Sequence, residues 1–184
     1  GAAWVAVLLA FFVTSTGLGK VGRARKEAVK LEFSKGDTRD VFQVLANGGV
    51  AAGAAMGMLA APSSMLAAAF LGAMATANGD TWATELGVLS RGEPFSLVRF
   101  RRVPRGTSGA VSGLGTLATI AGALTVGVVA AAGAAAGGEW LRIHPVRLAL
   151  IAVIAGTSGS LVDSLLGATV QAGYHCPTCQ RDSE

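Results

Sequence analysis

Charged side chains are scarce in this sequence, at 14% of 184 residues, whereas soluble domains carry about 25%. The shortage is concentrated in long Ala, Gly, Val and Leu segments, which excludes an ordinary soluble domain and indicates an integral membrane protein. These apolar runs also argue against a disordered Gly-rich chain. The sequence lacks an initiating Met and a basic leader, so we expect Gly1 to lie inside a longer protein rather than at a signal peptide.

Aromatic residues are also few, at 6%, and no regular series of them runs among the basic residues for bases to stack on. The net charge of +4 therefore does not indicate nucleic-acid binding. Of 15 Lys and Arg residues, seven lie between Lys20 and Arg39 and five between Arg91 and Arg105. Basic clusters beside apolar spans are typical of cytoplasmic loops, so we expect a bilayer and no nucleic acid as partner.

Cysteine occurs only twice, in the motif HCPTCQ, which contains His175, Cys176 and Cys179. A structural zinc site needs four ligands, and this motif supplies two cysteines and one histidine. Two interpretations stay open. The motif is half of a zinc site completed by another copy or by residues beyond Glu184, or it is a polar tail with two reduced thiols.

Long apolar runs are abundant. Each is close to or above the ~20 residues that a helix needs to cross a bilayer. They fall at about 2–18, 41–61, 63–79, 107–137 and 147–173. The sequence therefore predicts an all-α, polytopic transmembrane helical bundle, with one domain over residues 1–184 and both basic loops on the cytoplasmic side.

Glycines recur four residues apart in several of these runs. Small residues on one helical face let helix backbones approach each other in lipid, so the spacing predicts close Gly/Ala packing. The glycines concerned are Gly49, Gly53 and Gly57, the pair Gly109 and Gly113, and the pair Gly133 and Gly137.

Three acidic residues lie within or beside apolar runs: Asp80, Glu85 and Asp163. A charged carboxylate at the bilayer centre costs roughly 2.5–3.5 kcal/mol on insertion scales, so such residues persist where they face a cavity, a cation or a basic partner. We expect all three to face one cavity open to the cytoplasm and to serve as catalytic residues. For Glu85, a position at the membrane interface fits equally well.

The stretch ANGDT is rich in side-chain oxygen atoms. Gly79 predicts a break or a helix start at Asp80, which would turn its carboxylate towards the cavity. Asn78, Asp80 and Thr81 together form a cluster suited to Mg²⁺, and we expect Asp80 and Asp163 to be the metal ligands.

A polar stripe enters the second apolar run. Arg39, Gln43 and Asn47 recur four residues apart and therefore share one helical face. A guanidinium with amide donors matches a phosphate or a polar headgroup.

A second anion site is expected at RGTSG, where Arg105, Thr107 and Ser108 precede the fourth run. Free backbone N–H groups at a helix N-terminus, with hydroxyls and an arginine, suit an anion. The sequence contains no Walker A motif, so this is not a P-loop.

Five blocks occur in a characteristic order: FFVTSTGLGKVGRARK, RDVFQVLANGGV, ANGDTWATELGVLS, RGTSGAVSGLGTLA and GSLVDSLLGATVQ. The set resembles the membrane family called domain of unknown function ninety-two, which includes animal transmembrane protein nineteen and chloroplast phytyl-phosphate kinases. The resemblance covers nearly the whole chain. Members of that family have further hydrophobic segments before and after the region matched here.

The resemblance implies a kinase that transfers a phosphoryl group from CTP or ATP to an isoprenoid monophosphate, with Mg²⁺ as cofactor. The roles expected are metal binding by Asp80 and Asp163, phosphate binding by Arg39 and Arg105, and orientation by Asn47 and Asn78. The family positions matched in this chain are Asn47, Asn78, Asp80, Thr81, Glu85, Thr107, Asp163 and Ser164. Gln43, Thr81, Thr107, Ser108 and Ser164 complete the expected nucleotide and phosphate contacts.

Other functions fit the same residues. A lipid cytidylyltransferase or a polyprenol kinase would use the same cavity, and a cation-coupled transporter would use the carboxylates for ion binding. A purely structural membrane protein would not need intramembrane carboxylates. A bacterial inner membrane or a plastid-type envelope, with the site facing the cytoplasmic side, and a possible homo-oligomer complete the expectations.

Overall fold

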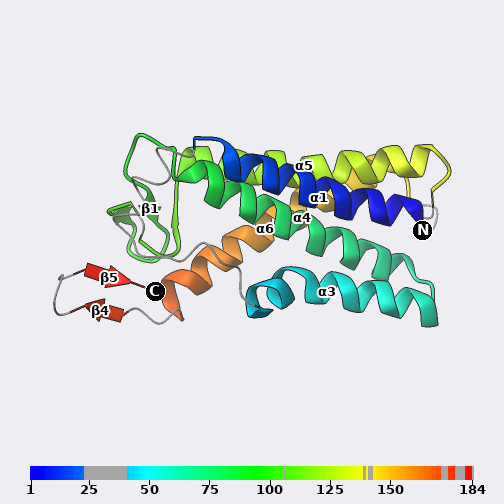
Figure 1. Cartoon of the computed structure of the whole chain (residues 1–184), viewed down its shortest axis with the longest axis horizontal. Helices are drawn as coiled ribbons and strands as arrows, with labels where there is room; N and C mark the ends of the chain where they lie inside the picture. Colours follow the sequence, from blue (N-terminus) through cyan, green and yellow to red (C-terminus); the bar gives the residue numbers. More distant parts are fainter. Residues whose placement is uncertain are drawn as a thin grey trace.

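The computed structural model describes residues 1–22, 41–105, 107–138, 140, 143–170, 174–176 and 181–183, with the side chains of 41–44, 46, 174–176 and 181–183 outside the description. The described chain is mainly helical, which confirms the predicted fold class (Figure 1). Its helices are α1 (Ala2–Lys20), α3 (Val41–Ala60), α4 (Ser64–Gly87), α5 (Gly113–Ala135) and α6 (Pro145–Thr169).

Each helix from α4 onwards begins at a side chain that accepts a hydrogen bond from a free backbone N–H group. Ser63 accepts from the Met65 N–H at the start of α4. Pro62 lies between α3 and α4, where it prevents α3 from continuing. Ser112 accepts from the Gly115 N–H at 3.0 Å and so begins α5. His144 caps α6, and Pro145 fits its first turn because proline has no N–H to satisfy there.

Helix α4 is the centre of the bundle. It contacts α1, α3, α5 and α6, and the picture shows α1 and α3 on either side of it (Figure 1). Three described helices, α1, α5 and α6, are long and apolar enough to cross a membrane. Packing against these helices buries Asn78 and Thr81, two polar residues in the middle of α4.

Close packing occurs at glycines where α4, α5 and α6 meet. A methyl group added at Gly79 would lie 2.9 Å from the Thr119 carbonyl oxygen, and one at Gly122 would lie 3.1 Å from Gly79 Cα. A methyl group at Gly127 would lie 2.9 Å from Ala149 Cα. Only a hydrogen fits at these contacts, so the predicted close Gly/Ala packing is confirmed.

The glycines predicted from four-residue spacing are mostly not the ones in contact. Gly49, Gly53, Gly113 and Gly137 would each have nothing within 4 Å of an added methyl group. That part of the prediction is wrong, because spacing identifies a face of small residues but not the helix that packs against it.

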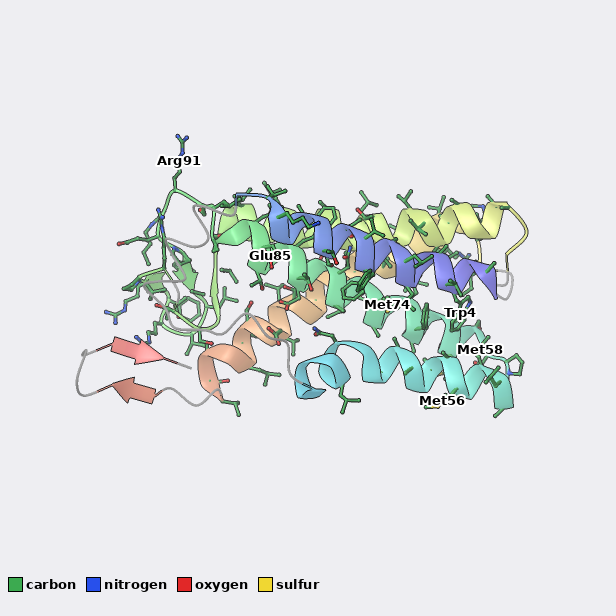
Figure 2. The ribbon with its side chains drawn as sticks, in the orientation of Figure 1. Trp4, Met56, Met58, Met74, Glu85 and Arg91 are labelled. Carbon is green, nitrogen blue, oxygen red and sulfur yellow. The ribbon has the colours of Figure 1, made fainter. Side chains whose placement is uncertain are left out.

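A stack of aromatic rings closes the core at one end of the bundle. The ring centroid of Trp4 on α1 lies 4.3 Å from that of Phe70 on α4 and 5.5 Å from that of Trp140. Trp140 lies in the connection between α5 and α6 and is 1% exposed. Figure 2 shows Trp4 at this end and Glu85 near the other end of α4, so the aromatic stack and Glu85 are separated along the bundle.

Two small sheets lie outside the helices and were not predicted. The first has the strand order β2-β1-β3, with β1 (Phe95–Ser96) between β2 (Arg101–Arg102) and β3 (Ala110–Val111). The second pairs β4 (Tyr174–Cys176) with β5 (Arg181–Ser183). Cys179 and the side chains of His175 and Cys176 lie outside the described residues, so zinc binding there stays a prediction.

Candidate functional site

Asp80 and Asp163 are brought together from α4 and α6. The Ser160 hydroxyl, one turn before Asp163 on α6, donates to Asp80 Oδ1 at 3.5 Å. Asp163 follows Ser160 by three residues on α6, so it lies on a neighbouring position of the same helix. The two expected metal ligands therefore lie on packed helices beside the same serine, and their binding of a metal stays a prediction.

Helix α4 is continuous through Asp80. It runs from Ser64 to Gly87, so the predicted break or helix start at Gly79 is wrong. Gly79 instead lets α5 pack closely against α4, because the Thr119 carbonyl group occupies the space that a side chain at position 79 would fill. Asp80 reaches Ser160 from an ordinary helical turn, which needs no unwound segment.

Asn78 does not belong to the carboxylate site. It is fully buried, and its amide nitrogen donates to the Gly122 carbonyl oxygen of α5 at 2.8 Å. Its Oδ1 accepts from Ser15 at 3.1 Å and from Thr14 at 3.3 Å, both on α1. Both ends of the amide therefore join α4 to its neighbours, and the orientation of a ligand by Asn78 stays a prediction.

Thr81 also turns its hydroxyl into the helix. The hydroxyl donates to the Ala77 carbonyl oxygen at 2.8 Å, and the residue is buried. The hydroxyl proton is therefore bonded within α4, and a contact of Thr81 with a cofactor stays a prediction.

Glu85 does not complete a three-residue metal cluster. Among the described residues, no three Asp, Glu, His or Cys side chains come together in a group that would hold a metal ion. Glu85 is half-buried near the loop end of α4 (Figure 2). The expectation that Glu85 faces the same cavity as Asp80 and Asp163 stays a prediction.

Asp163 lies on an exposed face of α6 and lines a hollow of about 270 Å³. The other described lining residues are Leu166, Gly167 and Val170, which follow Asp163 along the same helix. Leu166 and Val170 are 53% and 74% exposed. The hollow is shallow and open, and it places exposed apolar side chains of α6 beside the Asp163 carboxylate.

The loop before α5 is docked onto α6 next to Asp163. Gly109 has φ of 67°, and a methyl group there would collide with the Ser164 carbonyl oxygen and with Ala168. This contact brings the Thr107–Gly109 segment to the Asp163–Ser164 segment. The structure thus joins two predicted site segments that are more than fifty residues apart in sequence.

The predicted anion site at the start of the fourth run needs correction. Helix α5 begins at Gly113, so Thr107 and Ser108 do not stand at its N-terminus. The Thr107 hydroxyl donates to the Pro104 carbonyl oxygen at 2.8 Å, and the Arg105 guanidinium donates to the Arg91 carbonyl oxygen. These contacts shape the loop, and they place Arg105 in a fixed position at this end of the bundle.

The polar stripe on α3 is only partly visible. Arg39 lies outside the described residues, as does the side chain of Gln43, and Asn47 is exposed on α3. A phosphate contact by these three residues stays a prediction.

Ser160 was missed by the sequence reasoning. It stands three residues before Asp163 in TSGSLVD, and that spacing places both on neighbouring positions of one helix. Its second contact, 3.5 Å to the Thr119 hydroxyl of α5, links α5 to the carboxylate pair. The i, i+3 spacing was a usable signal, but its partner Asp80 is eighty residues away.

The whole chain, residues 1–184, matches the family described as integral membrane protein DUF92. The chain belongs to this family. This result agrees with the membrane bundle and with the resemblance noted in the sequence. No solved structure matches the chain.

Three curated relatives show how the chain compares with longer proteins. It is 36% identical to Protein PGR of Arabidopsis thaliana, with 93% of this chain and 65% of PGR covered. It is 30% identical to an uncharacterized membrane protein of Methanocaldococcus jannaschii, with 91% and 65% covered. It is 31% identical to Protein VTE6, chloroplastic, of Arabidopsis thaliana, with 93% and 50% covered. The chain thus spans between half and two thirds of these relatives.

Proposed function

We propose that this protein is a membrane-embedded kinase that transfers a phosphoryl group from CTP or ATP to an isoprenoid monophosphate and gives the diphosphate. The observation that carries the proposal is the pairing of Asp80 with Asp163 across two helices of a membrane bundle. The resemblance of the sequence blocks to phytyl-phosphate kinases supports the same reaction.

The carboxylate pair fits Mg²⁺. This ion is usually held by one or two carboxylates, and waters and substrate phosphates complete its octahedral shell. Asp80 and Asp163 would supply the two carboxylates. When bound, Mg²⁺ neutralises phosphate charge that would otherwise repel these carboxylates.

The residues of this chain hold and orient the reactants. The Ser160 hydroxyl fixes Asp80, and the contact of Gly109 with α6 keeps the loop of Arg105 and Thr107 beside Asp163. We expect the first part of the isoprenoid chain to run along the exposed apolar residues that follow Asp163 on α6, such as Leu166. Phosphoryl transfer relies mainly on such positioning and on charge neutralisation, and an ionised phosphate acceptor needs no strong general base.

The test uses the chain reconstituted in nanodiscs, γ-labelled CTP or ATP and a panel of prenyl monophosphates, with and without EDTA. We expect labelled diphosphate that disappears with EDTA, and a loss of at least about 100-fold in Asp80→Asn and in Asp163→Asn, as expected when a charge-stabilising group is removed. Glu93→Gln changes an exposed loop carboxylate and should retain activity. Full activity in both aspartate variants would show that the pair is not the site.

The same assay separates the alternatives. With α-labelled CTP, transfer of label to the lipid would indicate a cytidylyltransferase. With γ-labelled nucleotide, labelling of a free prenyl alcohol would indicate a polyprenol kinase. Cation flux across vesicles without nucleotide consumption would indicate a transporter.

A further inference from the structure

The hairpin of β1 and β2 is an ordered, basic feature outside the carboxylate site. Phe95 pairs with Arg102, and Ser96 pairs with Arg101, across a four-residue turn. The Arg99 N–H donates to the buried Ser96 Oγ at 3.2 Å, which closes the turn from inside. The hairpin is also held by β3, which pairs with the other edge of β1.

Phe100 is displayed at the end of this turn. Its φ of 49° lies in the left-handed region, which is uncommon for a residue with a side chain. Its ring is 80% exposed, and Val98 in the same turn is 43% exposed. The flanking residues Arg99 and Arg101 are exposed as well. The fold therefore holds an apolar ring outward between two cations.

This hairpin lies at one end of the helical bundle. It follows α4 and precedes α5, and β1 stands beyond the ends of these helices (Figure 1). Helix α5 has 23 residues, which span about 34 Å and match the ~30 Å hydrocarbon layer. The hairpin is consequently at the level of the lipid headgroups when α5 spans the membrane.

We propose that the turn 97–100 binds anionic lipid headgroups of the surrounding bilayer, with Phe100 inserted below the phosphates and Arg99 and Arg101 bound to them. Charge complementarity supports this partner, because the segment 91–105 contains five arginines and one acidic residue, Glu93. The apolar ring supports it too, since a bilayer offers an apolar layer directly beneath its charges. A soluble acidic partner would offer the charges without that layer.

The test places a fluorescent NBD label at Phe100→Cys, with Cys176→Ser and Cys179→Ser removing the native thiols. The protein is reconstituted in vesicles of phosphatidylcholine alone or mixed with phosphatidylglycerol. We expect a blue-shifted emission that is quenched by lipid-borne nitroxide in the mixed vesicles, and we expect added salt to reduce both effects. A label at Ala136→Cys, in the exposed turn after α5 at the other end of the bundle, should show no dependence on phosphatidylglycerol.

Charge variants test the arginines separately from the ring. Arg99→Gln combined with Arg101→Gln should abolish the dependence on phosphatidylglycerol, whereas Arg147→Gln, an exposed arginine at the start of α6, should leave it unchanged. Hydrogen exchange of residues 95–103 in the unlabelled chain gives a second measurement, with slower exchange expected in nanodiscs that contain phosphatidylglycerol. Emission and exchange that are the same in both lipid compositions would overturn the proposal, whether or not the chain is a kinase.

Discussion

At the scale of single residues, some polar side chains of this bundle bond neighbouring helices together, and others keep atoms available to bind a ligand. Asn78 and Asp80 are two residues apart on α4, yet the first is fully buried with both amide ends bonded, whereas the second meets Ser160 and the charge of Asp163. From the sequence alone, both residues are expected to contact a metal ion or a phosphate. Their positions around α4 decide which one faces α1 and α5 and which one faces α6.

Replacing Asn78 should therefore affect stability. Asn78→Ala removes its bonds to Gly122, Thr14 and Ser15 and leaves polar groups unpaired in the interior. We expect a loss of about 1–3 kcal/mol in the free energy of unfolding, measured by denaturant titration in micelles. Asn47→Ala makes the same change at an exposed position of α3 and should cost much less. Equal losses in the two variants would contradict the structural role of Asn78.

Ser160 acts through Asp80, so we expect its replacement to weaken Mg²⁺ binding and to leave the stability of the fold largely unchanged. In Ser160→Ala, Asp80 loses its hydroxyl donor from α6. We expect the concentration of Mg²⁺ needed for half-maximal transfer to rise by about 10-fold, in the range seen when groups that orient metal ligands are removed. Ser160→Thr keeps the hydroxyl and should restore most of the affinity. An unchanged Mg²⁺ dependence in Ser160→Ala would separate Ser160 from the site.

At the scale of elements, contacts between helices depend on particular glycines. Gly79→Ala would place a methyl group 2.9 Å from the Thr119 carbonyl oxygen, and this backbone atom cannot move without shifting α5. We expect a loss of about 1–3 kcal/mol in unfolding free energy. Gly53→Ala, which meets nothing within 4 Å, should leave stability equal or slightly higher. A similar loss in both variants would show that the α4–α5 contact is not tight.

The docking of the loop before α5 can be tested in the same way. Gly109→Ala suffers both a positive φ of 67° and a collision with α6, whereas Gly137→Ala suffers a positive φ of 82° in open space. We expect Gly109→Ala to speed hydrogen exchange of residues 107–111 and to reduce transfer, and Gly137→Ala to change neither. Equal effects would mean that backbone strain alone, and not the contact with Ser164 and Ala168, explains the result.

At the scale of the whole molecule, the two ends of the bundle differ in charge. The arginine-rich loop between α4 and α5 lies at one end, where Figure 2 shows Arg91 projecting outward. The turn between α5 and α6 lies at the other end (Figure 1). The basic end is expected to face the cytoplasm, because basic loops are retained on that side.

This orientation gives a direct labelling experiment. In a background with Cys176→Ser and Cys179→Ser, a cysteine at Gly92 should react with a membrane-impermeant maleimide only in inverted bacterial vesicles. A cysteine at Ala136 should react only in intact spheroplasts. Labelling of both positions from one side would contradict a bundle whose α5 crosses the membrane.

The sequence by itself determined the solvent in which the chain folds and the residue types of the site. Apolar runs of sufficient length and basic clusters between them predict a helical membrane bundle, because hydrocarbon excludes unpaired backbone and clustered charge. Asp80 and Asp163 also stand out in the sequence, because a carboxylate in such surroundings is costly.

Only the tertiary structure decided which residues meet. It joined Asp80 on α4 to Ser160 on α6, and it turned Asn78 towards α1 and α5. It also replaced the expected break at Gly79 with a close contact to α5. The physical reason is that periodicity fixes the angular position of a residue on its own helix, whereas its partner depends on how helices distant in sequence pack against that face.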